Sequence, residues 1–195
     1  MYVIVGLGNP GEEYNETRHN TGRMMLDVFQ KKAEFSDWKV DKKLNAIVSE
    51  GKVGKNKAIL LKPETFMNNS GNSLKTLITS KKKAEELVVI HDDLDIPFGS
   101  FKISFNKSSG GHRGLESIIK VIKTQEFVRI RVGITPALAS GKMKKPSGEE
   151  AVIKHILGKF KNPEQEVLKK VSKKIAEALA VLIADGRQKA MGDFN

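Results

Sequence analysis

The chain has only four histidines, so each can be weighed as a group that transfers protons. His19 stands in the polar segment 17–21 (TRHNT), between a glycine-rich turn and the first predicted helix. A histidine at the edge of a loop, with an ordinary pKa of about 6.5, suits general-base catalysis. The residues alone allow equally well a surface histidine that caps a helix.

A second polar cluster, 91–95 (HDDLD), follows a predicted apolar strand over residues 86–90. In α/β proteins the crevice lies beyond the carboxyl ends of the strands, so we expect this cluster to face a functional cleft. A carboxylate such as Asp92 could hold a histidine in one tautomer and stabilise its protonated form. A turn rich in aspartate stays open as an alternative. So does a metal site built from His91, Asp92, Asp93 and Asp95, with His112 as an optional further ligand, although the spacing matches no metal motif.

Two further segments carry groups that could bind a polar substrate. Phe66, Met67 and Asn68 open a predicted helix, where we expect the first two side chains to be exposed and the amide to hold a carbonyl or an oxyanion. The alternative is a helix cap with a hydrophobic staple. Segment 108–114 (SSGGHRG) leads into another helix, whose N-terminal amides attract phosphate. Arg129 and Arg131 face the same side of a predicted strand.

Residues 6–11 (GLGNPG) match the dinucleotide-binding pattern G-x-G-x-x-G and follow a predicted strand. That pattern binds a pyrophosphate when its glycines open a helix. Here Pro10 and the acidic segment 12–16 (EEYNE) follow directly, and no apolar helix begins before about residue 21. The context therefore disfavours an enzyme that depends on a dinucleotide.

Apolar periodicity predicts the elements that must position these residues. The predicted strands cover residues 2–7, 46–49, 57–61, 86–90, 101–105 and 127–134, and the predicted helices cover 21–35, 68–78, 112–122 and 163–186. The last helix follows Asn162 and Pro163, a capping residue and a first-turn proline. Residues 135–148 contain two prolines, two glycines and three lysines, which predicts a basic surface loop. Interleaved strands and helices without a repeat or linker predict one α/β domain over residues 1–195.

Composition narrows the possible partners. The 34 Lys and Arg residues exceed the 23 Asp and Glu residues, which gives a net charge of +11 and makes nucleic acid the first polyanion to consider. A basic, well-solvated protein without such a partner is the alternative. The absence of cysteine excludes disulfides, thiolate metal sites and a cysteine nucleophile. No apolar run approaches the roughly 20 residues of a membrane span and the N-terminus lacks a signal-peptide pattern, so we expect a cytoplasmic protein.

Together these segments closely resemble bacterial-type peptidyl-tRNA hydrolase. Five separated motifs carry the resemblance in order along the chain: 6–11 (GLGNPG), 17–20 (TRHN), 62–68 (KPETFMN), 91–95 (HDDLD) and 110–112 (GGH). Residues 127–134, 156–158 and 190–195 add further matches, so that the resemblance spans nearly the whole chain.

The resemblance implies a mixed twisted sheet surrounded by helices. It also implies a usually monomeric enzyme with no metal, no cofactor, no membrane association and no obligate protein partner. Its partner would be the acceptor arm of peptidyl-tRNA, and its reaction would be hydrolysis of the ester bond between peptide and tRNA. His19 would be the catalytic base, held or polarised by Asp92.

The same resemblance implies roles for other residues. Asn9 and Asn68 would position the peptide main chain and the ester carbonyl. Residues that line the cleft or bind substrate would be Tyr14, Phe66, Met67, His112 and Arg113. Residues that contact tRNA would be Lys102, Lys107, Arg131, Lys142, Lys144 and Lys145, the last three on the lid-like loop 135–148.

The sequence departs from the family pattern at two places. Arg113 stands where the family usually has Asn, and an arginine donates hydrogen bonds but cannot accept them. Residues 133–136 (GITP) replace a Gly-Ile-Gly-Arg-Pro-like segment, so one basic contact is missing or comes from residues 142–145. Arg113 is the best support for an alternative function, an RNA-binding module of this fold that no longer hydrolyses. The presence of His19 and Asp92 argues against it.

Overall fold

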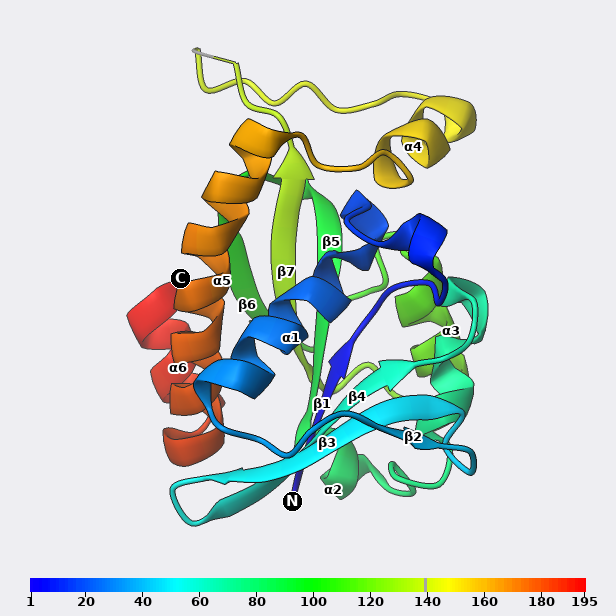
Figure 1. The fold of residues 1–195 in the computed structure, drawn as a ribbon, viewed down its shortest axis with the longest axis vertical. Coiled ribbons are helices and arrows are strands. Elements are labelled where there is room, and N and C mark those ends of the chain that lie inside the picture. The colour runs from blue at the N-terminus through cyan, green and yellow to red at the C-terminus, as the bar shows by residue number, and fades with distance from the viewer. Residues whose placement is uncertain (139) are drawn as a thin grey trace.

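The computed structural model describes residues 1–138 and 140–195. A seven-stranded mixed sheet forms its centre, with strand order β2-β3-β4-β1-β5-β7-β6 (Figure 1). The strands are β1 (Tyr2–Gly6), β2 (Lys39–Asp41), β3 (Ala46–Val53), β4 (Asn56–Pro63), β5 (Leu87–Pro97), β6 (Phe101–Phe105) and β7 (Val128–Thr135). Strands β4, β1, β5 and β7 are parallel, and the outer pairs are antiparallel. The predicted α/β domain with a mixed sheet is confirmed.

Helices cover both faces of the sheet (Figure 1). The helices of the described residues are α1 (Thr21–Lys32), α2 (Lys81–Ala84), α3 (Arg113–Ile122), α4 (Glu149–Ile156), α5 (Asn162–Asp185) and α6 (Arg187–Phe194). Three 3-10 segments join them, η1 (Glu12–Tyr14), η2 (Arg18–Asn20) and η3 (Met67–Leu74). Helices α1 and α5 pack on one face, and α3 with η3 packs on the other.

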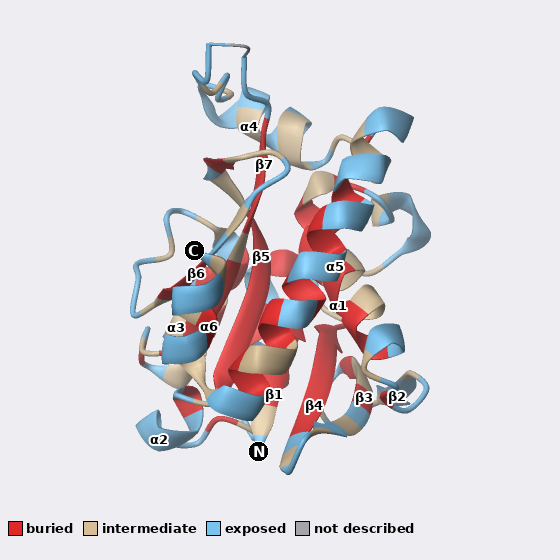
Figure 2. Ribbon diagram, turned by 90° about the vertical axis from the view of Figure 1, so that its left-hand side faces the viewer, coloured by how far each residue is buried: buried red, intermediate tan, exposed pale blue. Residues whose placement is uncertain are grey.

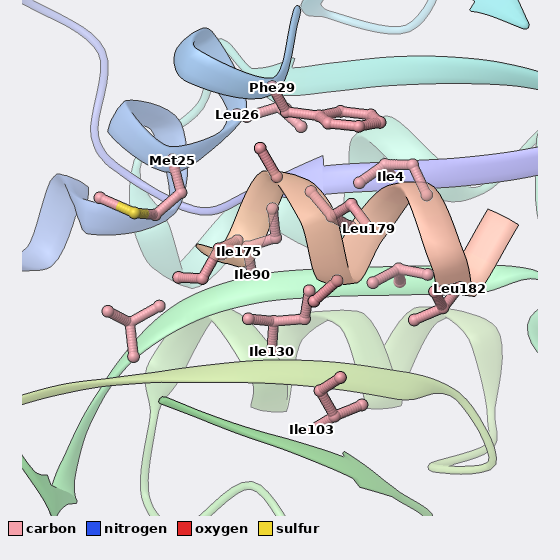
Figure 3. Packing of buried hydrophobic residues seen from close by; sticks show 14 of the residues in the cluster. Ile4, Met25, Leu26, Phe29, Ile90, Ile103, Ile130, Ile175, Leu179 and Leu182 are labelled. Carbon is pink, nitrogen blue, oxygen red and sulfur yellow. The ribbon is translucent and has the colours of Figure 1, made fainter. Parts of the chain in front are cut away.

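Alternation along the central strands divides the core in two. Ile4 and Ile90 point toward α1 and α5 and pack near Leu179 (Figure 3). Val89, next along β5, belongs to the second cluster, with Leu115 of α3. The central strands are buried on both faces (Figure 2), as parallel strands between two helical layers must be. They therefore give the residues at their ends a rigid base.

Strand β5 is longer than the sequence predicts, and this changes the setting of the acidic cluster. The prediction ended the strand at residue 90, whereas β5 runs to Pro97. Asp92 and Asp93 still pair with Val132 and Gly133 of β7, and the register shifts only between Asp93 and Pro97. The cluster is thus part of the sheet, because pairing with β7 outweighs the weak strand preference of aspartate.

Other predicted elements also need correction. The helix expected over residues 68–78 is the 3-10 segment η3, which is rich in Asn, Ser and Gly, poor formers of α-helix. Asn162 is not the cap of α5 but its first residue, and Lys161 occupies the cap position with its N–H bonded to Glu164. Strand β2 and helices α4 and α6 were missed because they are short and have few buried residues.

The predicted loop over residues 135–148 begins where β7 ends. Beyond Thr135, the last residue of β7, the only strand pairing in its described part is an isolated bridge between Ala137 and Met143, and residue 139 lies outside the description. Whether the loop acts as a lid stays a prediction. No helix in the described ranges combines the length and the apolar composition needed to cross a bilayer.

Glycines at the end of β1 and the start of α1 let this helix pack directly on the sheet. A Cβ at Gly22 would collide with the carbonyl oxygen of Ile90, and a Cβ at Gly6 would collide with the carbonyl of Gly22. Gly11 has a φ of 106°, which favours glycine. The glycines of the dinucleotide-like pattern thus have packing and turn roles, and they place η2 at the carboxyl ends of β1 and β5.

Candidate active site

The carboxyl ends of the four parallel strands meet at one edge of the sheet, and the predicted site residues gather there. Asn68 follows β4, Asn9 and His19 follow β1, and Asp92 and Arg131 lie within β5 and β7. All five line one cleft of about 890 Å³. Helix α4, at the top of Figure 1, contributes a wall of apolar side chains to it.

Segment η2, which carries His19, is tied to the start of α5. The guanidinium of Arg18 pairs with both carboxylate oxygens of Glu164, at 2.8 and 3.1 Å, and donates to the carbonyl of Gly158 at 3.1 Å. The side chain of His19, next along the segment, is only 10% exposed. The sequence contained no signal for this anchor, because its partners lie about 140 positions away.

His19 and Asp92 are in direct contact. The Nδ1 atom of His19 lies 3.0 and 3.1 Å from the two carboxylate oxygens of Asp92. Since an ionised carboxylate only accepts hydrogen bonds, Nδ1 carries the hydrogen and donates it. The Nε2 atom then keeps a free lone pair, which is what a general base requires.

Asp92 has a second histidine partner. The Nε2 atom of His112 lies 3.0 Å from Oδ1 of Asp92. On its other side, Nδ1 of His112 accepts the N–H groups of Gly114 at 3.1 Å and Leu115 at 3.4 Å and so caps α3. A nitrogen that accepts two N–H bonds carries no hydrogen, so Nε2 donates to Asp92. These first amides of α3 are therefore not free for a phosphate, contrary to the expectation from sequence.

Burial and charge act against each other on the titratable groups of this network. Burial would raise the pKa of Asp92, but the contacts with His19 and His112 hold that pKa well below its usual range. Burial would lower the pKa of His19, but the Asp92 carboxylate outweighs it, and the pKa of His19 is raised. Asp92 thus stays ionised and makes His19 a stronger base.

His91 supports this arrangement from within the sheet. Burial, reinforced by nearby His112, lowers the pKa of His91 to about 3, so the ring stays neutral. Its Nδ1 donates to the main-chain oxygen of Asp92 at 2.7 Å.

Asn9 is fixed by a side chain that sequence reasoning missed. Asn20 accepts the main-chain N–H of Asn9 and donates to its carbonyl, both at 2.9 Å. The Oδ1 atom of Asn9 accepts the N–H of Met67 at 2.8 Å, which leaves its amide N–H₂ as the group that can donate into the cleft. Asn20 directly follows His19 in the TRHN motif. This position next to a candidate catalytic residue was the one indication in the sequence that Asn20 belongs to the site.

The residues expected at the cleft rim differ in exposure. Phe66 is 59% exposed and Asn68 is exposed, and both line the cleft. Met67, expected to be exposed, is only 5% exposed, because its main chain is bonded to Asn9 and its sulfur packs close to Gly114.

The remaining predicted residues fall into two groups. His112, Arg113, Lys107, Arg131 and Lys145 line the cleft. Three of these form ion pairs, Arg131 with Asp93, Lys145 with Asp95 and Arg113 with Glu149. The residues that the structure does not bring to the cleft lining are Tyr14, Lys102, Lys142 and Lys144.

The group His19, Asp92 and His112 has the composition of a metal site, with candidate ligand atoms within 4.8 Å of one another. Its hydrogen bonds do not fit that role. Binding a cation through Nε2 of His112 would require the hydrogen to move to Nδ1, which faces two N–H donors. A carboxylate between two N–H donors describes the group better.

Comparison with known proteins agrees with this geometry. The family model for peptidyl-tRNA hydrolase matches residues 3–195. The peptidyl-tRNA hydrolase of Thermoanaerobacter sp. (strain X514) is 41% identical, with 100% of both chains covered, and that of Carboxydothermus hydrogenoformans is 39% identical, with 100% of this chain and 98% of the relative covered. The crystal structure of peptidyl-tRNA hydrolase from Acinetobacter baumannii superposes with a TM-score of 0.86 at 31% identity, covering 98% of this chain and 93% of that one. The chain belongs to the peptidyl-tRNA hydrolase family.

Proposed function

We propose that this chain hydrolyses the ester bond that joins a peptide to tRNA, with His19 as the general base. The contact between Nδ1 of His19 and the Asp92 carboxylate, at 3.0 Å, carries the proposal, because it leaves Nε2 free to accept a proton inside the cleft. Membership of the peptidyl-tRNA hydrolase family supplies the substrate class.

The reaction follows from the positions of these groups. Nε2 of His19 takes a proton from water while the oxygen of that water attacks the ester carbonyl, and Asp92 stabilises the imidazolium. Amide donors of Asn9 and Asn68 hold the negative charge that develops on the carbonyl oxygen. The intermediate collapses when the bond to the ribose oxygen breaks, and that oxygen receives the proton from His19. The products are free tRNA and a peptide carboxylic acid, which loses its proton to the solvent and becomes a carboxylate.

Other residues receive supporting roles in this proposal. Phe66 and Met67 contact the peptide, and His112, whose two ring nitrogens both have partners, positions Asp92. The tRNA acceptor arm lies on the basic surface around Lys102, Lys107, Arg131, Lys142, Lys144 and Lys145. The enzyme works as a cytoplasmic monomer, without a cofactor or an obligate protein partner.

The alternative of an RNA-binding module without activity gains no support. Arg113, its best sequence argument, forms an exposed ion pair with Glu149 of α4, 3.0 Å long. Among the described residues its side chain bonds to Glu149 and not to His19, Asp92 or His112.

The rate should depend on pH through His19. Only the neutral ring can accept a proton, and the Asp92 carboxylate raises the pKa of His19 against the opposing effect of burial. We expect kcat/KM to fall as pH decreases through a value above the ordinary histidine pKa of about 6.5. A profile of kcat/KM against pH measures the pKa of His19 in the free enzyme. An acid limb centred below the ordinary histidine pKa of about 6.5 would contradict the role given to Asp92.

The direct test is to mix the purified chain with peptidyl-tRNA and follow the release of free tRNA. We expect multiple turnovers that a chelator leaves unchanged, because the proposed base is an imidazole. Absence of turnover would overturn the proposal. Turnover that a chelator abolishes and added divalent metal restores would replace it by a metal-dependent hydrolase.

A further inference from the structure

The acidic groups of the cleft all have partners. Asp93 pairs with Arg131 at 2.8 Å, Asp95 with Lys145 at 2.6 Å and Glu149 with Arg113 at 3.0 Å. Asp92 is held between the two histidines. Two cations that line the same cleft, Lys107 and Arg129, form no ion pair with any described residue. The cleft therefore carries a local excess of positive charge beside the proposed catalytic group.

Arg129 is unusual because its charge is buried. The residue is 1% exposed, and its Nη1 donates to the carbonyl oxygen of Ser108. Its Nε and Nη2 atoms are buried without a hydrogen-bond partner among the described residues. The guanidinium of Arg129 has five N–H bonds. Its main partners are one carbonyl oxygen and the ring of Phe127, whose centre lies 4.6 Å from the guanidinium carbon.

This environment is not that of an ordinary structural arginine. Arg131, two positions along the same strand, has a carboxylate partner, whereas Arg129 has none in the described structure. Burial, together with the charge of Arg131, lowers the pKa of Arg129 to about 10, so the group stays charged at neutral pH. A buried cation without a counter-ion is costly, which makes an anion bound nearby favourable.

The surface above Arg129 offers contacts for such an anion. Ser108, whose carbonyl holds the guanidinium, is exposed and lines the cleft, and exposed Lys107 precedes it. A buried charge acts on the cleft through low-dielectric protein, where its field is stronger than in water. An anion that rests on segment 107–109 would have Lys107 beside it and Arg129 beneath it.

We propose that Lys107 and Arg129 form a site for a phosphodiester, the last internucleotide phosphate before the esterified nucleotide of the substrate. This inference rests on the proposed function, since it assigns to one subsite the polynucleotide end of that substrate. The ester carbonyl at His19 and the phosphate at segment 107–109 would then be held in one cleft. The site would favour esters of an oligonucleotide over esters of a single nucleoside.

Binding of a small probe tests the site apart from turnover. The dinucleoside monophosphate CpA contains the phosphodiester, and adenosine lacks it. We expect wild type to bind CpA more tightly than adenosine, and Arg129→Met to weaken CpA binding by about tenfold, the loss expected for one charged partner. Lys107→Met should also weaken CpA binding and reduce its dependence on salt. Adenosine binding should change in neither variant, and Lys170→Met on the exposed face of α5 is the matched control.

The outcomes separate the two proposals. Unchanged CpA binding in Arg129→Met, or equal loss of adenosine binding, would overturn the phosphodiester site. If Arg129→Met does not fold, unchanged CpA binding in Lys107→Met overturns it instead. If wild type prefers CpA to adenosine and loses this preference in the variants, but does not cleave peptidyl-tRNA, the phosphodiester site stands and the proposed function fails.

Discussion

Replacing His19 with alanine is expected to lower kcat/KM for peptidyl-tRNA by about 10²–10⁴-fold, the usual contribution of a general base. The affinity for tRNA should change little, because the ring contacts Asp92 rather than the basic surface. The variant should fold, since the Asp92 carboxylate keeps the bond from His112. Single-turnover rates with peptidyl-tRNA and equilibrium binding of uncharged tRNA measure the two effects separately.

Two further variants sharpen this test. His19→Asn retains an N–H donor near the position of Nδ1 but has no basic nitrogen, so it should be as slow as His19→Ala while preserving stability. His155→Gln is the matched control, because the side chain of His155 bonds the carbonyl of Ile134, at 2.9 Å, and no other described residue, and it does not line the cleft. Retained turnover in both His19 variants would remove His19 from the mechanism.

The sequence was sufficient to predict the partners at the centre of the site but not the way in which they are held. His19 and Asp92 were paired through the motifs that contain them, and the structure brings them together at 3.0 Å. The second bond to Asp92, from His112, depends on the rotation of a ring that also caps α3. No spacing in a sequence encodes such a rotation, because it is decided by packing between elements far apart in the chain.

Prediction of the fold from the sequence has the same limit, because contacts between distant segments decide part of the secondary structure. Strong apolar runs predicted β1, β7 and α5 to within a few residues. Tertiary pairing decided the rest: β5 continues through its aspartates because β7 lies beside it. Helix α4 has no buried residue of its own and lacks the apolar face that would mark it. Tyr14, placed in the cleft by resemblance, lies in η1 outside the lining.

The proposed mechanism makes a separate prediction for the carboxylate, and His112 decides its outcome. In Asp92→Asn the side chain has one accepting oxygen and one donating nitrogen in place of two oxygens. His112 can only donate toward residue 92, because its Nδ1 is occupied by the N–H groups of Gly114 and Leu115. The amide oxygen must therefore take the place of Oδ1, which lies 3.0 Å from Nε2 of His112 and 3.0 Å from Nδ1 of His19, and the amide nitrogen takes the place of Oδ2, 3.1 Å from Nδ1 of His19.

That orientation places an N–H donor against Nδ1 of His19, where the wild type has only acceptors. An amide N–H that donates to Nδ1 forces the ring to carry its hydrogen on Nε2, so no lone pair points toward the water. With the charge lost, burial and Arg113 lower the pKa of His19 without opposition. We expect kcat/KM to fall by about 10²–10⁴-fold at every pH, and nitrogen NMR shifts of His19 to show the proton moving from Nδ1 to Nε2. A variant that keeps the hydrogen on Nδ1, or the wild-type rate, would mean that Asp92 does not set the tautomer. Asp93→Asn, which breaks only the ion pair with Arg131, should leave the signals of His19 in place.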